Sequence, residues 1–187
     1  EYLGPGMNFS QMVLHPASRL SWHLQEQPWN GYVTLEEFYN SYEDADLRKK
    51  ASFLTGPQFD FSGSAVIDYT ENDGELQLKY TPAINELQPN AQAESGARPA
   101  KFSFKLFGRR EMDNDFPIVR LGEVYLIRAE ARARFSGNWA GAEPDVNVLR
   151  ARAGVEPYIG TLTADEFLAE RGREMFQEAI RRTDLIR

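Results

Sequence analysis

Aromatic rings and side-chain amides gather in the first third of the chain. Trp22, Trp29, Asn30 and Tyr32 lie in a stretch with many turn-forming and glutamine residues, and Tyr2 precedes them. Flat aromatic side chains stack on the apolar faces of sugar rings, while polar neighbours bind the hydroxyls. Because binding residues concentrate in loops, this group predicts a carbohydrate-binding surface. The alternative is that these rings pack the loop onto a helix expected at residues 35–43.

Three glutamates near the C-terminus, Glu170, Glu174 and Glu178, recur every four residues and so share one face of a helix. Two carboxylates could supply acid–base catalysis at a glycosidic bond. Arginines lie among them, however, and a carboxylate held by arginine has a lowered pKa, which is wrong for a general acid. We therefore expect structural ion pairs and no catalytic residues. The expected pairs are Glu178 with Arg181 or Arg182, and Glu123 and Glu130 beside Arg120 and Arg134.

No cofactor or metal site is predicted. The chain has no cysteine, and His15 and His23 lack the helical spacing of a zinc motif. The acidic run 113–115 lacks the spacing and closing glutamate of a calcium loop. Nucleotide-binding and nucleophile-elbow motifs are also missing from the sequence.

Composition limits the remaining classes. The chain has 187 residues, 42% of them hydrophobic, and a formal net charge of −7. This is too apolar for a disordered chain and too acidic for a broad nucleic-acid footprint. No apolar run approaches the roughly 18 residues of a membrane-spanning helix. The chain opens at Glu1 without a signal peptide and stops at Arg187 without a domain-ending tail, so we expect a fragment of one larger domain.

Residues 1–115 are expected to be loop-rich, with a short helix and a β-hairpin. Thr34 and Glu37 form the pattern of a capping box, which predicts a helix ending near residue 44. Alternating residues around an Asp-Gly turn predict paired strands at 65–70 and 75–80. A third strand is predicted at 101–107, and 81–99 should be a long loop.

Residues 116–187 are expected to be helical. Pro117 suits the first turn of one helix, and Gly154 suits the left-handed end of a second. Thr163 with Glu166 predicts a capping box that opens a third helix, running to about residue 182. Trp139 lies in the turn between the first two helices and should pack the pair. The predicted class is mainly α with an irregular, partly β N-terminal half.

Several ordered segments resemble the SusD/RagB family of outer-membrane nutrient-binding lipoproteins. The resemblance covers most of the chain, and its blocks stand in the family's order. They are 120–131, 145–154 and 170–187, preceded by Pro28-Trp29-Asn30-Gly31, Phe38-Tyr39 and Asp46-Leu47-Arg48.

The resemblance implies a SusD-like fold of tetratricopeptide-like helix pairs with a looped, partly β region attached. It implies non-catalytic binding of oligosaccharides, or of peptides in some members. The implied partner is a SusC-like TonB-dependent transporter, at the exterior face of the outer membrane. Membrane contact would come only through an N-terminal lipid, whose cysteine this chain lacks. The alternatives are a helical-repeat scaffold that binds protein, and a glycoside hydrolase.

Overall fold

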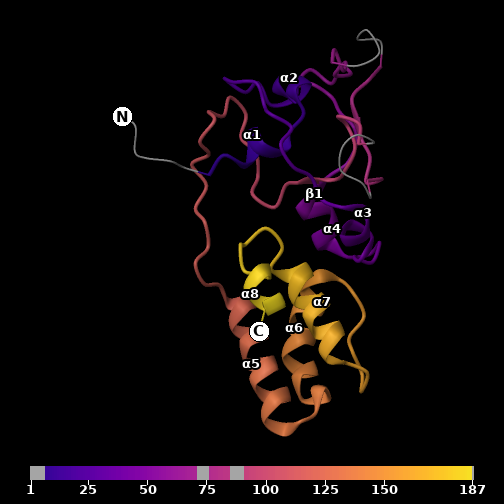
Figure 1. Ribbon diagram of the computed structural model, residues 1–187, viewed down its shortest axis with the longest axis vertical. Helices are drawn as coiled ribbons and strands as arrows, with labels where there is room; N and C mark the ends of the chain where they lie inside the picture. The colour runs from indigo at the N-terminus through magenta and orange to yellow at the C-terminus, as the bar shows by residue number, and fades with distance from the viewer. Residues whose placement is uncertain (1–6, 71–75, 85–90, 187) are drawn as a thin grey trace. The chain divides into compact units, whose positions relative to one another are not determined.

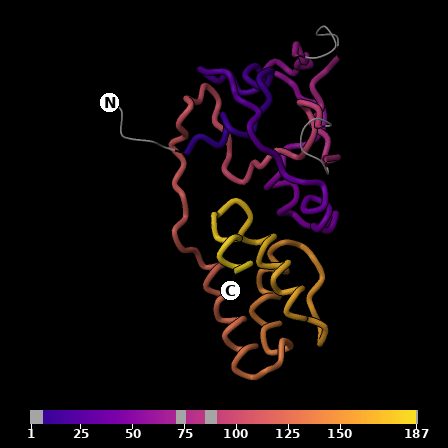
Figure 2. Tube along the Cα trace, viewed as in Figure 1, coloured from indigo at the N-terminus to yellow at the C-terminus, as the bar shows by residue number. Residues whose placement is uncertain are grey.

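The computed structural model describes residues 7–70, 76–84 and 91–186 (Figure 1). It divides into two compact units, the first formed by Glu1–Asn40 and Ser52–Asp115 and the second by Ser41–Ala51 and Phe116–Arg187. Figure 2 traces the chain through both. Tyr2 and the Asp-Gly turn of the predicted hairpin lie outside the described residues. No helix in the described ranges is long and apolar enough to cross a membrane.

The first unit contains short elements joined by loops. Its strands pair in twos, β1 with β4 and β2 with β3, both antiparallel. Pro57 and Pro99 lie in β2 and β4, and each lacks the N–H that a longer ladder would need. The elements are α1 (Phe9–Val13), a 3-10 turn (Pro16–Ser18), α2 (Arg19–Trp22), α3 (Glu36–Asn40), β1 (Phe53–Leu54), β2 (Gly56–Pro57), β3 (Lys79–Tyr80) and β4 (Arg98–Pro99).

The pairing predicted between 65–70 and 75–80 is present as an isolated antiparallel bridge of Ile67 with Gln77. The regular strands are not, because 65–70 forms none and β3 pairs with β2. The N–H of Leu78 donates to the carbonyl of Val66 at 2.8 Å, and the N–H of Asp68 donates to Leu76 at 2.9 Å. Val66 and Leu78 then bury their side chains with Ala17 and Tyr80 in a small core.

The strand predicted at 101–107 is wrong. Phe102 and Phe104 are buried as the alternation required, but no strand forms over these residues. Phe102 instead stacks on Phe9 of α1, with ring centroids 5.3 Å apart. Side-chain packing therefore produces the alternation without a hydrogen-bonded ladder.

The capping box predicted at Thr34 is also wrong. The N–H of Thr34 donates to the carbonyl of Ala97 at 2.9 Å in an isolated β-bridge, and the Thr34 hydroxyl is buried without a hydrogen-bond partner. Helix α3 consequently begins later, at Glu36, and it ends at Asn40.

The second unit is a set of packed helices. Leu126 and Ala129 of α5 pack against Val146 and Leu149 of α6 in its core. Trp139 packs there as expected, with its ring 5.1 Å from that of Phe167. The elements are α4 (Leu47–Ser52), which begins in this unit, α5 (Leu121–Ser136), a 3-10 turn (Trp139–Ala142), α6 (Glu143–Ala153), α7 (Ala164–Glu174) and α8 (Arg181–Ile186).

Two helix boundaries differ from the prediction. Helix α5 begins at Leu121, so Pro117 lies before it rather than in its first turn. The third predicted helix is split into α7 and α8, because Gln177 and Ala179 adopt left-handed backbone angles, with φ of 63° and 62°. The helical spacing expected between Glu178 and Arg181 or Arg182 is lost, and Glu178 is bound by Arg120 at 2.7 Å.

The capping box at the start of α7 is confirmed. The Thr163 hydroxyl accepts from the Glu166 N–H at 3.2 Å, and the Glu166 carboxylate accepts from the Thr163 N–H at 2.8 Å. We expect Thr163→Ala to lower the free energy of unfolding by about 1 kcal/mol, because an orphaned helix N–H loses its acceptor. Urea denaturation followed by far-ultraviolet circular dichroism measures the change. Thr161→Ala, at an exposed side chain nearby, is the control, and an equal loss there would contradict the capping role.

Candidate functional site

A hollow of about 700 Å³ lies in the first unit, between the segment after Trp29 and the segment before β4. Apolar side chains and polar amide and hydroxyl groups share its lining. This mixture suits a ligand with apolar faces and hydroxyl edges. The lining includes Tyr32, Val33, Leu35, Ile84, Gln92 and Ser95, together with Asn30 and Arg98; we call it the Asn30 hollow.

Asn30 and Arg98 form a clamp with the backbone of Ala93. The guanidinium of Arg98 donates to the Asn30 side-chain oxygen and to the Ala93 carbonyl, both at 2.5 Å, and the Asn30 amide donates to the same carbonyl at 2.8 Å. The clamp ties the two walls of the hollow together. The Asn30 amide therefore positions the wall of the hollow, and the ligand contact that the sequence suggested for it stays a prediction.

Arg98 is fully buried, and its guanidinium lies 4.5 Å from the centre of the Tyr80 ring. In the part of the chain described, no carboxylate forms an ion pair with it. Burial lowers the pKa of Arg98 to about 10, so the side chain stays charged at neutral pH. Carbonyl oxygens and the ring face compensate this charge.

Tyr32 lines the Asn30 hollow, whereas Trp29, one residue before Asn30, is exposed but is not among the lining residues. Trp29 is 49% exposed and Tyr32 is 39% exposed. Burial raises the pKa of Tyr32, which therefore stays a neutral phenol able to donate a hydrogen bond. The backbone between them is fixed to α1. The Trp29 N–H donates to the Gln11 carbonyl at 2.7 Å, and the Tyr32 N–H donates to the Met12 carbonyl at 3.1 Å. A fixed backbone thus holds two rings at the surface.

Trp22 does not line the Asn30 hollow. Its ring is partly buried and meets that of Phe104 edge-on at 5.5 Å, next to Val13 and Leu24. The structure therefore gives Trp22 a packing role. Nothing in the lone sequence separated this indole from that of Trp29.

His15 is fully buried and bound on both ring nitrogens. Its Nδ1 accepts from the Ala17 N–H at 3.1 Å, so the proton of the neutral ring belongs on Nε2, which lies 3.2 Å from the Thr70 hydroxyl. Asp68 lies 3.4 Å from the same nitrogen. Among the described residues, no three histidines or carboxylates are grouped closely enough to hold a metal ion.

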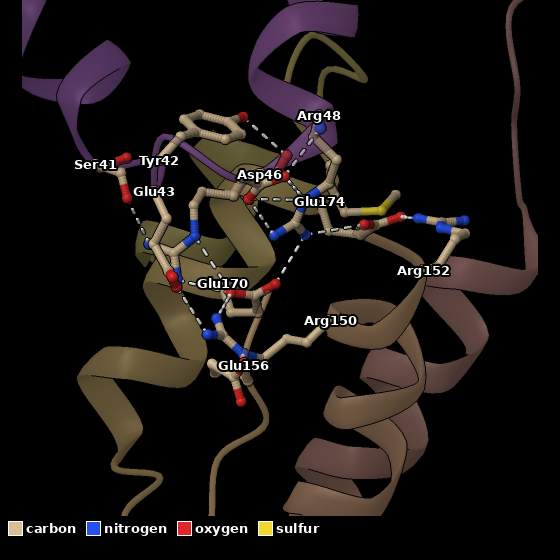
Figure 3. A network of polar contacts seen from close by, with 12 residues as sticks. Ser41, Tyr42, Glu43, Asp46, Arg48, Arg150, Arg152, Glu156, Glu170 and Glu174 are labelled. Carbon is tan, nitrogen blue, oxygen red and sulfur yellow. Dashed lines mark hydrogen bonds and ion pairs between the residues drawn. The ribbon is translucent and has the colours of Figure 1, made fainter. Parts of the chain in front are cut away.

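The glutamates of α7 lie in a network of ion pairs in the second unit (Figure 3). Glu170 is fully buried and binds Arg48 at 2.7 Å, Arg150 at 3.0 Å and Arg173 at 2.7 Å. Burial alone would raise the pKa of Glu170, but the charges of Arg48 and Arg173 outweigh it and lower that pKa. The carboxylate is held ionised, and the ion pairing expected in place of catalysis is confirmed.

The same network joins residues 41–51 to the C-terminal helices. Arg48 pairs with Asp46 at 2.7 Å and reaches Glu174 at 3.2 Å, as Figure 3 shows. Glu174 also binds Arg120 at 2.6 Å and Arg152. Of the pairs predicted from the sequence, Glu130 with Arg134 is confirmed at 2.8 Å, whereas Glu123 lies 3.7 Å from Arg171.

Sequence reasoning missed one wall of the hollow. Gln92, Ser95 and Arg98 belong to a stretch expected to be a long loop without a pattern. The proline and amide content of that stretch resembles the stretch around Trp29, and this was the only signal available.

The family model described as the SusD family matches residues 11–187. The starch-binding protein SusD of Bacteroides thetaiotaomicron is 44% identical over 75 residues, which cover 40% of this chain and 13% of that protein.

Solved structures show the same fold. Surface glycan-binding protein A from Bacteroides thetaiotaomicron superimposes with a TM-score of 0.66 at 20% identity, covering 98% of this chain and 37% of that one. The same protein in complex with laminarihexaose also gives 0.66, at 21% identity, with 97% and 37% covered. A SusD-like protein from Bacteroides fragilis gives 0.62 at 20% identity, with 96% and 40% covered. This chain spans about two fifths of the length of these solved relatives.

Proposed function

The chain belongs to the SusD family, and on that premise we propose that its first unit binds oligosaccharides and releases them unchanged. The mainly helical, SusD-like fold expected from the sequence is confirmed by the solved relatives.

The observation that carries the proposal is the exposed ring of Tyr32 in the lining of the Asn30 hollow, together with the exposed ring of Trp29, one residue before Asn30. Trp29 and Tyr32 offer flat faces for the apolar side of a sugar, and Gln92 and Ser95 can bind its hydroxyls. A relative described as a surface glycan-binding protein holds laminarihexaose, and the SusD relative is described as starch-binding. Both descriptions favour a glucose-containing oligosaccharide as the first ligand to test.

Binding without catalysis is supported by the state of the glutamates that the sequence offered as catalytic candidates. Glu170 and Glu174 have lowered pKa values despite their burial, because arginines surround both. A glycoside hydrolase needs a carboxylic acid that keeps its proton near neutral pH. We expect no turnover of labelled oligosaccharides, and product formation would contradict this part of the proposal.

The proposed partner is a SusC-like TonB-dependent transporter, with the full-length protein held by an N-terminal lipid on the exterior face of the outer membrane. Family membership supports this assignment. Co-purification of the full-length protein with the transporter encoded beside its gene tests it. A full-length protein that stays in the soluble cell fraction would contradict it.

We expect Trp29→Ala and Tyr32→Ala each to weaken binding of laminarihexaose or maltohexaose by about 10- to 30-fold. Loss of an aromatic contact at the centre of an interface commonly changes the binding free energy by about 2 kcal/mol. Isothermal titration calorimetry measures the affinities. Phe135→Ala is the matched control, because this ring is 95% exposed in the second unit. Full affinity in both site variants would contradict the assignment, and binding of peptides but of no glycan would favour a peptide ligand.

The protein-binding scaffold remains the second candidate, because α5 exposes apolar side chains at Leu121, Ile127 and Phe135. The accompanying prediction of buried indoles holds in part for Trp22 and is wrong for Trp29. Trp29 is half-exposed, so we expect acrylamide to quench its fluorescence and saturating oligosaccharide to protect it. Protection by a protein partner alone would favour the scaffold.

A further inference from the structure

A second hollow in the first unit shares no lining residue with the Asn30 hollow. Its volume is about 210 Å³, which suits one sugar ring better than a longer ligand. Its lining comes from α1, the residues after α2 and the segment before the second unit. The lining residues used below are Ser10, Gln25, Lys105, Phe107, Arg109 and Asn114, and we call it the Phe107 hollow.

The ring of Phe107 is held in solvent by a strained backbone. Phe107 is 64% exposed and has a φ of 58°, which a bulky residue rarely adopts. The Phe107 N–H donates to the Trp22 carbonyl at 2.9 Å, and the Gln25 side-chain amide donates to the Phe107 carbonyl at 3.3 Å. These two hydrogen bonds fix the strained turn. His23, with a φ of 47°, packs its ring 5.3 Å from that of Phe107. Strained backbone angles of this kind are concentrated at functional sites.

Two polar atoms at this hollow lack hydrogen-bond partners. Ser10 is only 2% exposed and its hydroxyl is unpartnered. The side-chain oxygen of Asn114 is likewise buried and unpartnered, although its amide nitrogen donates to Ser103 at 3.3 Å. Buried polar groups are nearly always satisfied. A hydroxyl-bearing ligand would supply an acceptor or donor for Ser10 and a donor for Asn114.

Most of the charges around the Phe107 hollow are paired with one another. Lys105 pairs with Asp113 at 2.6 Å, and Arg110 pairs with Glu111 at 2.8 Å. Of the charged side chains described at this hollow, Arg109 forms no ion pair and remains available to donate to a hydroxyl. A flat ring, unpartnered polar atoms and one guanidinium donor together suit the apolar face and the hydroxyl edge of a sugar.

We propose that the Phe107 hollow is a second carbohydrate subsite, in which Phe107 stacks on one sugar ring and Ser10 and Asn114 bind its hydroxyls. This inference rests on the proposed function of the chain. It adds a contact point that the Asn30 hollow does not provide, and two points on one unit raise the effective concentration of a long glycan at the surface.

Calorimetric titration of the whole chain with laminarihexaose and maltohexaose tests the stacking role. We expect two binding events in the unmodified protein. Phe107→Leu keeps an apolar side chain but removes the flat face, and it should weaken one event about five- to tenfold. Trp29→Ala should weaken the other event and leave this one in place. Urea midpoints near that of the unmodified protein show that each variant is folded.

Ser10→Ala separates a binding hydroxyl from a structural one. Removing an unpartnered buried hydroxyl should leave the urea midpoint unchanged or raise it. Loss of a hydrogen bond to sugar should weaken the second event about fivefold. Opposite effects on stability and affinity are therefore expected from one substitution.

The failure of this inference differs from the failure of the proposed function. Suppose that the unmodified protein shows a single binding event, which Trp29→Ala weakens and which Phe107→Leu and Ser10→Ala leave unchanged. The second subsite is then wrong and the proposed function stands. If the unmodified protein binds neither laminarihexaose nor maltohexaose, the proposed function and this subsite are both overturned.

Discussion

Glu170→Gln should lower the free energy of unfolding by about 3–5 kcal/mol. Glu170 is fully buried and binds three arginines, one from residues 41–51, one from α6 and one from α7. Removing one partner of a buried ion pair leaves a charge uncompensated, and losses of that size are typical. Urea denaturation followed by far-ultraviolet circular dichroism measures the effect.

The size of this effect follows from the geometry around the carboxylate. Glutamine keeps the shape of glutamate but replaces one acceptor oxygen with a donor, which would face the guanidinium of Arg48 or Arg173. Arg48 keeps Asp46 as a partner at 2.7 Å and Arg150 keeps Glu43 at 2.8 Å, whereas Arg173 loses the carboxylate that it binds at 2.7 Å. The lost interaction is therefore shared among residues distant in sequence.

Glu156→Gln is the matched control for this substitution. Glu156 is exposed, and its backbone carbonyl rather than its side chain accepts from Arg150 (Figure 3). We expect the control to change stability by less than about 0.5 kcal/mol. A loss below about 1 kcal/mol for Glu170→Gln would show that water already solvates the network, and the structural role given to it would be wrong.

The structural features that could be predicted from the sequence are those that a few neighbouring residues specify. The capping box of Thr163 and the left-handed Gly154, with a φ of 74°, ended or began helices where expected. Each depends on a side chain or backbone angle within one helical turn. The pairing of Val66 with Leu78 was equally local, because alternation and turn chemistry specify it.

Features set by distant contacts could not be predicted. The break after α7 contains no glycine that would have predicted it. It is instead held by Arg120, which lies more than fifty positions earlier, donates to the Glu174 carbonyl at 2.6 Å and binds the Glu178 carboxylate. Residues 41–51 belong to the helical unit because Arg48 meets Glu170. Neither contact leaves a periodic pattern in the sequence.

The candidate site shows the same division. Composition indicated an aromatic and amide-rich surface, but it could not tell the exposed Trp29 from the packed Trp22. The opposite wall of the Asn30 hollow comes from a stretch whose position depends on Arg98, a buried charge in a short edge strand. Only the folded chain brings these two stretches together.

Asn30→Ala should lower the free energy of unfolding by about 3 kcal/mol. The substitution removes the acceptor of Arg98 and a donor to Ala93, and it leaves a buried guanidinium N–H without its partner. It also places alanine at a φ of 55°, which costs about 1 kcal/mol. Measured in a Trp139→Phe background, indole fluorescence reports only on the first unit during urea denaturation, because Trp22 and Trp29 lie there.

Asn30→Gly separates the clamp from the backbone angle. Glycine loses the same side-chain hydrogen bonds but adopts a positive φ without strain, so we expect it to be about 1 kcal/mol more stable than the alanine variant. Both variants should also weaken oligosaccharide binding, because the wall that carries Gln92 and Ser95 is tied to Asn30 through Ala93. Weakened binding with unchanged stability would instead make Asn30 a direct ligand contact, and stability and affinity both unchanged would show that the clamp does not hold the wall.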